Sequence, residues 1–332
     1  MNISHLELCG GGGGQALGIE TAGFSCAGVI EVDENCCNTL RKNRPKWNVM
    51  NADLRTVDPC EFKGVELITA GVPCPPFSVA GRQLGADDER DMFPSAVSII
   101  KETKPAAVLF ENVAGLASPK FEDYRRDLFT TLESLGYRIT FKLVEAANFG
   151  VPQMRRRFII IALRPKIYKR FRWPVASVEP PTVGVIIRDL MASRGWKGTA
   201  AWSKKCNKIA PTIVGGSKKH GGPDLGPTRA KEQWKALAVD GSGIANEPPD
   251  VSFPENMNPK LTVRMVARIQ SFPDSWQFTG GKTAEYRQVG NAFPPLVARA
   301  LGVSLHNAFN TEISVAPAEL DPWKQQLLIN FH

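Results

Sequence analysis

The sequence predicts an α/β fold, in which a mixed, mostly parallel sheet is covered by helices on both faces and a smaller, loop-rich domain is attached. Up to about residue 163, short apolar runs alternate with longer amphipathic runs, a pattern typical of strands and helices that follow one another. Beyond that point the chain becomes rich in Pro, Gly, Lys and Trp, and its periodicity weakens. We therefore predict a first domain over 1–163, a second over 164–280, and a C-terminal segment over 281–332 that returns to the first.

The runs of the first domain define its elements in chain order. Apolar runs predict strands over 6–9, 28–32, 65–70, 106–110 and 158–163. Amphipathic runs predict helices over 15–22, 36–43, 95–104 and 124–135. Helical periodicity returns at Leu261, and Pro294-Pro295 predicts the start of a last helix, because proline is favoured in a first turn.

Composition limits the class of protein. Of the 332 residues, 43% are hydrophobic and 22% charged, which excludes a disordered, collagen-like or coiled-coil chain. No apolar run approaches the ~20 residues of a membrane span, and the first residues lack the pattern of a signal peptide. The seven cysteines are scattered and odd in number, which favours reduced thiols and a cytoplasmic protein. No cysteine pairs have metal-ligand spacing, so we expect no metal. Because no apolar run is long enough to span a membrane, we expect no membrane partner either.

Charge is concentrated in the middle of the chain. Residues 151–235 hold 19 Lys and Arg against 4 Asp and Glu, a net charge of +15, whereas the whole chain carries +8. Such a basic segment favours a polyanionic partner, above all nucleic acid. A solvated basic face without a partner is the alternative.

A glycine run follows the first predicted strand. Gly10 to Gly14 precede the first helix, an arrangement in which the backbone can approach a ligand. Glu31 and Asp53 end the next two strand-like segments, where carboxylates can bind a nucleoside. The glycines alone could form only a flexible loop, but together with the acids they predict a nucleoside-binding edge. The run lacks the Gly-Lys-Ser/Thr ending of a nucleotide-phosphate loop.

Cys74 is the candidate nucleophile. It follows the strand predicted over 65–70, and the prolines on both sides of it restrict the loop that carries it. Strand ends at this edge of an α/β sheet carry active sites. The other six cysteines are interpreted as inert core residues.

Glu111 and a pair of arginines are the other candidate catalytic residues. Glu111 follows an apolar strand, and a carboxyl in that position can act as an acid or a hydrogen-bond donor. Arg155 and Arg157 alternate with Arg156 before the last strand, so we expect both to face one side and to suit a phosphate or a polar base edge. A capping acid and a basic rim are the alternatives.

These blocks and their order resemble the DNA (cytosine-5) methyltransferases, in particular the single-chain prokaryotic and phage enzymes. The resemblance spans about residues 5 to 300. It implies the Rossmann-like fold of the class I S-adenosylmethionine-dependent methyltransferases, with a target-recognition domain in the basic middle segment. It rests on the glycine run, Glu31, Asp53, Pro73-Cys74-Pro-Pro-Phe-Ser, Glu111-Asn112-Val113, Gln153-Met-Arg155-Arg-Arg157, Arg264 to Pro273, and Gln288-Val-Gly290-Asn291-Ala292.

The resemblance implies a reaction. A methyl group would pass from S-adenosylmethionine, leaving S-adenosylhomocysteine, to carbon 5 of a cytosine flipped out of a specific duplex DNA sequence. Cys74 would attack carbon 6, and Glu111 would stabilise the intermediate at ring N3. Arg155 and Arg157 would hold the base oxygen and a nearby phosphate.

The resemblance also implies a set of cofactor contacts. Glu31 would bind the ribose hydroxyls, and Asp53 would bind the adenine amino group. The chain departs from the family at Cys9, where Phe is commoner, and at Pro75, where Gln is commoner; these departures concern the adenine wall and the stiffness of the loop. The implied cofactor-binding residues are Leu8, Cys9, Gly11, Gly13, Gly14, Glu31, Val32, Asp53, Leu54, Pro73, Met92, Asn291 and Ala292.

The implied partner is double-stranded DNA. A monomer that associates with the nucleoid when bound to DNA, and a companion restriction endonuclease of a restriction-modification system, are further expectations. The implied nucleic-acid contacts are Ser78, Arg82, Lys204, Lys205, Lys208, Lys218, Lys219 and Arg229.

Three other functions stay open at the level of sequence. The same Pro-Cys and Glu-Asn-Val blocks occur in relatives that methylate cytosine in tRNA. A non-catalytic nucleic-acid-binding protein and a nicotinamide-dependent dehydrogenase are the other two. The complete set of site blocks argues against the second function, and the basic segment argues against the third.

Overall fold

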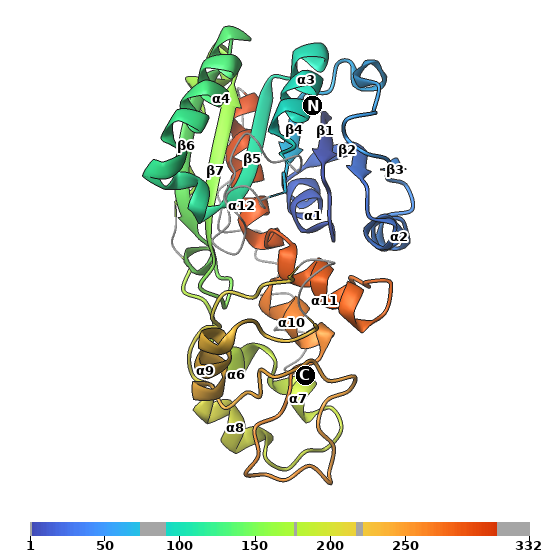
Figure 1. The fold of residues 1–332 in the computed structure, drawn as a ribbon, viewed down its shortest axis with the longest axis vertical. Helices are drawn as coiled ribbons and strands as arrows, with labels where there is room; N and C mark the ends of the chain where they lie inside the picture. The colour runs from blue at the N-terminus through green and yellow to red at the C-terminus, as the bar shows by residue number, and fades with distance from the viewer. Residues whose placement is uncertain (1, 74–90, 176–177, 217–221, 311–332) are drawn as a thin grey trace.

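The computed structural model describes residues 2–73, 91–175, 178–216 and 222–310. It has two parts (Figure 1): a sheet flanked by helices, and a lobe of short helices and long loops below it. Five of the predicted site residues lie outside the described residues, namely Cys74, Ser78, Arg82, Lys218 and Lys219.

The described strands form one seven-stranded sheet in the order β3-β2-β1-β4-β5-β7-β6. Only β7 runs antiparallel to its neighbours, so the predicted mixed, mostly parallel sheet is confirmed. The strands are β1 (Ile3–Leu8), β2 (Phe24–Glu31), β3 (Val49–Asn51), β4 (Leu67–Ala70), β5 (Ala107–Val113), β6 (Arg138–Glu145) and β7 (Arg156–Leu163).

All five strands predicted with bounds are present. β3 is the strand-like segment expected before Asp53, and its three residues are too few for a recognisable apolar run. β6 was not predicted. β6 is an edge strand whose side chains are mostly exposed, so it also lacks such a run. The prediction was wrong about the end of β5, which continues through Glu111 and Asn112 because both residues pair with β7.

Helices cover both faces of the sheet, as predicted. Residues that alternate along β5 enter different cores: Ala107 and Leu109 pack with α1 and α12 on one face, and Val108 and Phe110 pack with α3 and α4 on the other. The predicted last helix is confirmed, and it lies against α1. The helices of this part are α1 (Gly14–Thr21), α2 (Glu34–Asn43), α3 (Phe93–Thr103), α4 (Glu122–Ser134), α5 (Pro165–Tyr168) and α12 (Pro295–Phe309), with 3₁₀ turns at Pro59–Phe62, Ala114–Ala117, Pro119–Phe121 and Ala146–Asn148.

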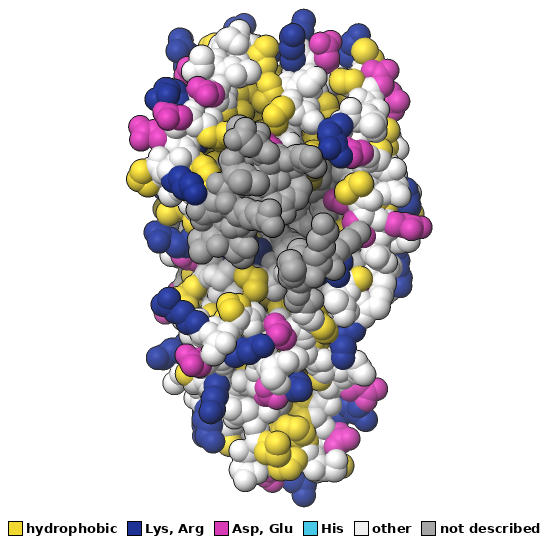
Figure 2. Space-filling model, viewed as in Figure 1, with side chains coloured by type: hydrophobic (Ala, Val, Ile, Leu, Met, Phe, Trp, Pro, Cys, Tyr) yellow, Lys and Arg dark blue, Asp and Glu magenta, His cyan; other side chains and the backbone are white. Residues whose placement is uncertain are grey.

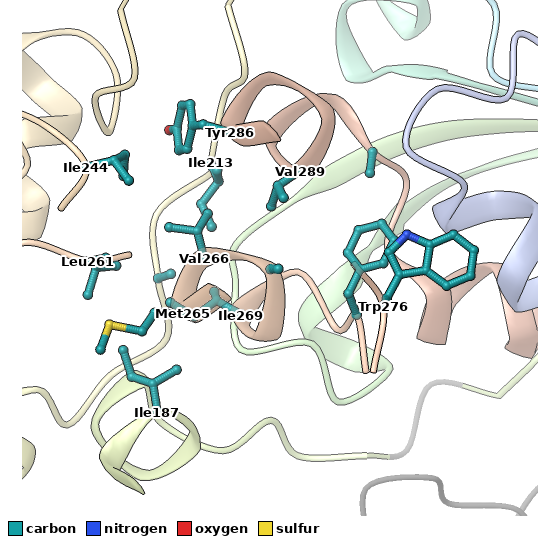
Figure 3. Close-up of a cluster of buried hydrophobic side chains, with 14 of the residues drawn as sticks. Ile187, Ile213, Ile244, Leu261, Met265, Val266, Ile269, Trp276, Tyr286 and Val289 are labelled. Carbon is teal, nitrogen blue, oxygen red and sulfur yellow. The ribbon is translucent and has the colours of Figure 1, made fainter. Parts of the chain in front are cut away.

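The lobe is loop-rich, and its core is continuous with that of the sheet. In Figure 3, Val266 of one helix lies near Val289 of the next, and both belong to one buried cluster. The same buried cluster extends to Ala16 and other residues of the glycine-turn region. The helices on both sides of residue 280 share this core, so the core does not mark a boundary there. The domain boundaries at 163 and 280 stay predictions. The helices are α6 (Val183–Ile186), α7 (Arg188–Ala192), α8 (Thr199–Lys205), α9 (Thr228–Ala236), α10 (Val263–Ile269) and α11 (Lys282–Asn291).

Candidate active site

The predicted site residues gather at the carboxyl ends of β1, β2, β4 and β5. From β1 the chain continues to β2 and β3 on one side of the sheet, and from β4 it continues to β5 on the other side. Open α/β sheets bind ligands at the point between two such halves, where the direction of the strand order reverses. The antiparallel β7 brings its first residues to the same edge, where Arg157 pairs with Val113 at the end of β5. The topology therefore brings residues from distant parts of the sequence to one edge.

The glycine run is a tight turn that packs against the C-terminal part of the chain. The φ angle is +53° at Gly11 and +87° at Gly13, in the region that favours glycine. A methyl group on Gly13 would lie 2.7 Å from Trp276, and one on Gly14 would lie 2.2 Å from the carbonyl oxygen of Phe293. A methyl group on Gly11 would meet no described atom within 4 Å. Packing therefore explains two of the predicted cofactor-binding glycines, and only Gly11 leaves open space beside the backbone.

Replacing Gly14 by alanine should destabilise the protein more than replacing Gly11. At Gly14 the new methyl group would overlap the backbone of Phe293, and forcing the two segments apart should lower the free energy of unfolding by about 3 kcal/mol. At Gly11 the alanine meets only left-handed backbone strain, about 1–2 kcal/mol. Urea unfolding of the two variants checks this order, and a smaller loss for Gly14→Ala than for Gly11→Ala would contradict the packing argument.

Glu31 lies at the tip of β2 and holds the glycine turn. The backbone N–H of Gly11 donates to Oε2 at 2.7 Å, and that of Asp33 donates to Oε1 at 2.7 Å. Burial raises the pKa of Glu31 above its usual range. Each carboxylate oxygen has a second lone pair, so the carboxylate can still accept hydrogen bonds from hydroxyl groups.

Asp53 and its neighbours form the next part of this edge. The guanidinium of Arg55 donates to the two carboxylate oxygens of Asp53 at 2.9 and 2.6 Å, and these hydrogen bonds lower the pKa of Asp53 to about 2. Leu54 is buried, whereas Val32, directly after Glu31, is 67% exposed. An exposed apolar side chain between two acids offers a surface for the flat side of a base.

Leu8 and Cys9 connect β1 to the glycine turn. Leu8 is fully buried in the sheet, and Cys9 is partly exposed with a left-handed φ of +57°. Burial and the neighbouring acids, Glu31 first among them, raise the pKa of the Cys9 thiol. The thiol is therefore held neutral, as expected for an inert cysteine.

The remaining predicted cofactor residues lie in three separate segments. Asn291 ends α11, is exposed, and donates from Nδ2 to the carbonyl oxygen of Gly216 at 3.3 Å. Ala292 follows it and is buried. Met92 is the half-buried N-cap of α3, and Pro73 is exposed after β4.

Glu111 and Arg157 form an ion pair between β5 and β7. Arg157 Nε lies 2.7 Å from Glu111 Oε1, and the two side chains are only 12% and 10% exposed. Arg157 therefore fixes the orientation of the Glu111 carboxylate. The structure thus brings together two of the four predicted catalytic residues.

Arg155 points elsewhere, contrary to the expectation that it shares a side with Arg157. β7 begins only at Arg156, so strand alternation does not extend to Arg155. Its guanidinium donates to the carbonyl oxygens of Ile213 at 2.6 Å, Gly290 at 3.0 Å and Ala292 at 2.8 Å. With 1% of its surface exposed, Arg155 joins three segments of backbone, and its predicted contact with a base or phosphate stays untested.

Two residues at this edge were not predicted as site residues. Asn112 is fully buried, and its Nδ2 donates to the carbonyl oxygen of Val72 at 3.4 Å, which ties β5 to the loop after β4. Its place in the Glu111-Asn112-Val113 block is the signal that could have found it. Gln15, in the first turn of α1, is 4% exposed although its side chain is polar. A polar residue directly after the glycine run is the corresponding signal.

The four described basic residues of the lobe that were predicted to contact DNA are exposed. Lys204 and Lys205 end α8, Lys208 follows it, and Arg229 lies in the first turn of α9. In the described part of the chain, no acid forms an ion pair with any of these four side chains. Figure 2 shows Lys and Arg side chains on the outside of the lobe. Trp202 and Trp234 of the lobe are buried core residues.

Similarity to known proteins decides the family. The family described as C-5 cytosine-specific DNA methylase matches residues 3–307. The chain belongs to this family. The predicted resemblance is confirmed, and the chain is a DNA cytosine-5 methyltransferase.

Curated relatives cover nearly all of this methyltransferase. The Type II methyltransferase M.NaeI of Lentzea aerocolonigenes is 50% identical over 315 residues, which span 94% of this chain and 76% of that enzyme. The Type II methyltransferase M.NgoMIV of Neisseria gonorrhoeae is 46% identical over 315 residues, which span 94% of this chain and 100% of that enzyme.

Solved structures share the fold of this methyltransferase. A DNA modification methyltransferase encoded within an Escherichia coli prophage superposes with a TM-score of 0.63 at 21% identity, over 93% of this chain and 100% of that chain. A DNMT2 of Spodoptera frugiperda has a TM-score of 0.62 at 18% identity, over the same shares of the two chains. The predicted Rossmann-like fold of the methyltransferases is thereby confirmed.

The described residues contain neither a membrane-spanning helix nor a cluster of metal ligands. No helix among them is long and apolar enough to cross a membrane. No cluster of three or more His, Cys, Asp or Glu side chains among them could hold a metal ion.

Proposed function

We propose that this methyltransferase transfers a methyl group from S-adenosylmethionine to carbon 5 of a cytosine flipped out of a specific duplex DNA sequence, through a covalent bond to Cys74. The observation that carries the proposal is the buried ion pair of Glu111 and Arg157, which lies at the same sheet edge as the glycine turn and Glu31. A nucleoside-binding edge and a fixed carboxylate are the two parts that this reaction needs side by side.

The described residues fit the methyl donor. Gly11 leaves open space beside its backbone, and Glu31 can accept hydrogen bonds from ribose hydroxyls in that region. Asp53 stays ionised and can accept a hydrogen bond from an adenine amino group, and Val32 offers an apolar surface to the ring. When bound, S-adenosylmethionine supplies an electrophilic methyl group. The other proposed cofactor contacts are Leu8, Cys9, Gly13, Gly14, Leu54, Pro73, Met92, Asn291 and Ala292.

Three side chains of this methyltransferase act on the base, and a fourth stabilises their arrangement. Carbon 5 of cytosine is a weak nucleophile, and attack of the Cys74 thiolate on carbon 6 raises the electron density at carbon 5, which takes the methyl group. The proton then leaves carbon 5, and the electrons of that bond restore the ring double bond and expel the Cys74 thiolate. Glu111 holds a hydrogen bond or a proton at ring N3, where charge develops. Arg157 fixes that carboxylate and directs its remaining N–H groups to the base oxygen or a nearby phosphate. Arg155 stabilises this arrangement by donating hydrogen bonds to the backbone carbonyls on either side of Asn291.

The lobe supplies the contacts with DNA. Lys204, Lys205, Lys208 and Arg229 are exposed and have no described acidic partner, so their charges are available to phosphates. These contacts offset the unstacking of the flipped base, which costs a few kcal/mol. Ser78, Arg82, Lys218 and Lys219 stay proposed contacts on the basis of sequence alone.

The family match and the Type II relatives favour DNA over tRNA as the substrate. Both relatives carry the M. prefix of modification enzymes in their names. We therefore also propose that a companion restriction endonuclease cuts the sequence that this chain methylates.

A trapped adduct tests the proposal. A duplex that contains 5-fluorocytosine in the recognised sequence should form a stable covalent complex in the presence of S-adenosylmethionine, because fluorine cannot leave carbon 5 as the proton does. The complex should be visible on a denaturing gel and absent with Cys74→Ser. Bisulfite sequencing of DNA from cells that express the chain supplies the sequence to use. Methylation of tRNA but not of plasmid DNA, or an adduct that persists in Cys74→Ser, would overturn the proposal.

A further inference from the structure

Gln15 is a buried polar residue. Only 4% of its surface is exposed, and neither Oε1 nor Nε2 has a hydrogen-bond partner among the described residues. A buried amide that makes no hydrogen bond costs about 1–3 kcal/mol, and native proteins seldom contain one without a functional reason. It lies in the first turn of α1, directly after the glycine run.

Three oxygen atoms converge above Gly71, the residue that follows β4. A methyl group placed on Gly71 would lie 3.4 Å from Gln15 Oε1, 3.7 Å from the carbonyl oxygen of Cys9 and 3.8 Å from Glu111 Oε2. These oxygens are the three nearest described atoms, and they come from α1, the loop after β1, and β5. We call this group the oxygen socket. Because residue 71 is glycine, no side chain fills it.

The oxygen socket suits a small cation that donates hydrogen bonds. A carbonyl oxygen, an amide oxygen and a carboxylate oxygen are all acceptors, and together they create a negative potential at one point. An anion or an apolar group would meet only unfavourable contacts there. An ammonium group has three N–H donors and a positive charge, so it can satisfy three oxygens at once.

We infer that Gln15 binds the α-ammonium group of the methyl donor through Oε1, in the oxygen socket above Gly71. The inference rests on the proposed use of S-adenosylmethionine and assigns to Gln15 a contact that the sequence does not predict. The socket adjoins the glycine turn on one side and Glu111 on the other, which are the proposed donor and base sites. Bound in this way, the amino-acid end of the donor would satisfy the buried amide of Gln15.

Three ligands and one isosteric variant test the inference. Gln15→Met preserves the length of the side chain and removes the amide. Isothermal titration calorimetry of the wild-type protein and Gln15→Met should use S-adenosylmethionine, S-adenosylhomocysteine and 5′-methylthioadenosine, which lacks the amino-acid end. The variant should bind the first two about 10- to 100-fold more weakly, the loss typical of a hydrogen bond to a charged group. It should bind 5′-methylthioadenosine as the wild-type protein does.

A second measurement separates binding from structure. Because the Gln15 amide has no partner without the ligand, the thermal unfolding midpoint of ligand-free Gln15→Met should be equal to or above that of the wild-type protein. Equal weakening of all three ligands, together with a lower midpoint, would overturn the inference in favour of a structural role. Weakening of S-adenosylmethionine alone would overturn it in favour of a contact with the sulfonium. If the wild-type protein binds neither adenosyl amino acid, the proposed function itself fails, whereas unchanged binding by Gln15→Met overturns only the role of Gln15.

Discussion

Replacing Arg155 by methionine should lower the free energy of unfolding by about 3–5 kcal/mol. The substitution leaves the carbonyl oxygens of Ile213, Gly290 and Ala292 buried without their donor, and removing one side of a buried charged network has a cost of this size. Since Ile213 and the end of α11 belong to the lobe, whereas Arg155 directly precedes β7 of the sheet, the variant should also separate the lobe from the sheet more easily. Urea denaturation followed by tryptophan fluorescence measures the loss.

The two following arginines provide matched controls in the same tripeptide. Arg156 is 66% exposed on its side chain and lies 4.0 Å from Glu145, so Arg156→Met should change the free energy of unfolding by less than about 0.5 kcal/mol. Arg157→Met should reduce methylation much more than Arg156→Met does, because it releases Glu111. If Arg155→Met unfolds at the same urea concentration as Arg156→Met, Arg155 does not hold these segments together.

Replacing Glu111 by glutamine should reduce the rate of methyl transfer by the folded protein about 10³-fold. Glutamine preserves the shape and one acceptor oxygen, but it cannot exchange a proton with the cytosine ring, and the loss of acid–base catalysis has a magnitude of about 10²- to 10⁴-fold. The charge that holds Arg157 is also removed. Single-turnover incorporation of labelled methyl groups into duplex DNA measures the rate directly.

Binding and a surface control separate the chemical role of Glu111 from a structural one. The affinity of Glu111→Gln for unmodified duplex DNA should stay within a few-fold of the wild-type value, because the exposed lysines of the lobe are unchanged. Asp123→Asn removes an acid from an exposed pair with Arg126 on α4 and should leave both the rate and the affinity unchanged. A rate for Glu111→Gln within 10-fold of the wild type would argue against an acid–base role for this carboxyl.

Local patterns in the sequence were sufficient for most of the sheet and for part of the site. The buried strands were found because their side chains form continuous apolar runs, and β6 was missed because an exposed edge strand has no such run. Glu31 and Asp53 were found because they follow strands whose ends meet at one edge. Glu111 was correctly connected to this edge, although it lies within β5 and not after it.

The glycine run shows where local reasoning stops. The sequence indicates a turn that brings backbone close to something, and at Gly13 and Gly14 that neighbour is the chain itself, at Trp276 and Phe293. These residues are more than 250 positions away, and no local pattern predicts their contact. The ligand interpretation requires open space beside Gly11, Gly13 and Gly14. Of these three glycines, only Gly11 has no described atom within 4 Å of an added methyl group.

By itself, the sequence determined the order of the elements, the family and the residues that meet at the sheet edge, because burial, turns and strand ends are local properties of the chain. Only the tertiary structure decided which arginine is paired with Glu111 and which holds the backbone together. The three carbonyl partners of the Arg155 guanidinium are 58 and more positions away, and β7 begins only at Arg156, so strand alternation does not place Arg155 beside Arg157. The same long-range packing brings the amide oxygen of Gln15 to Gly71 together with oxygens of Cys9 and Glu111, and it leaves the amide without a hydrogen-bond partner among the described residues.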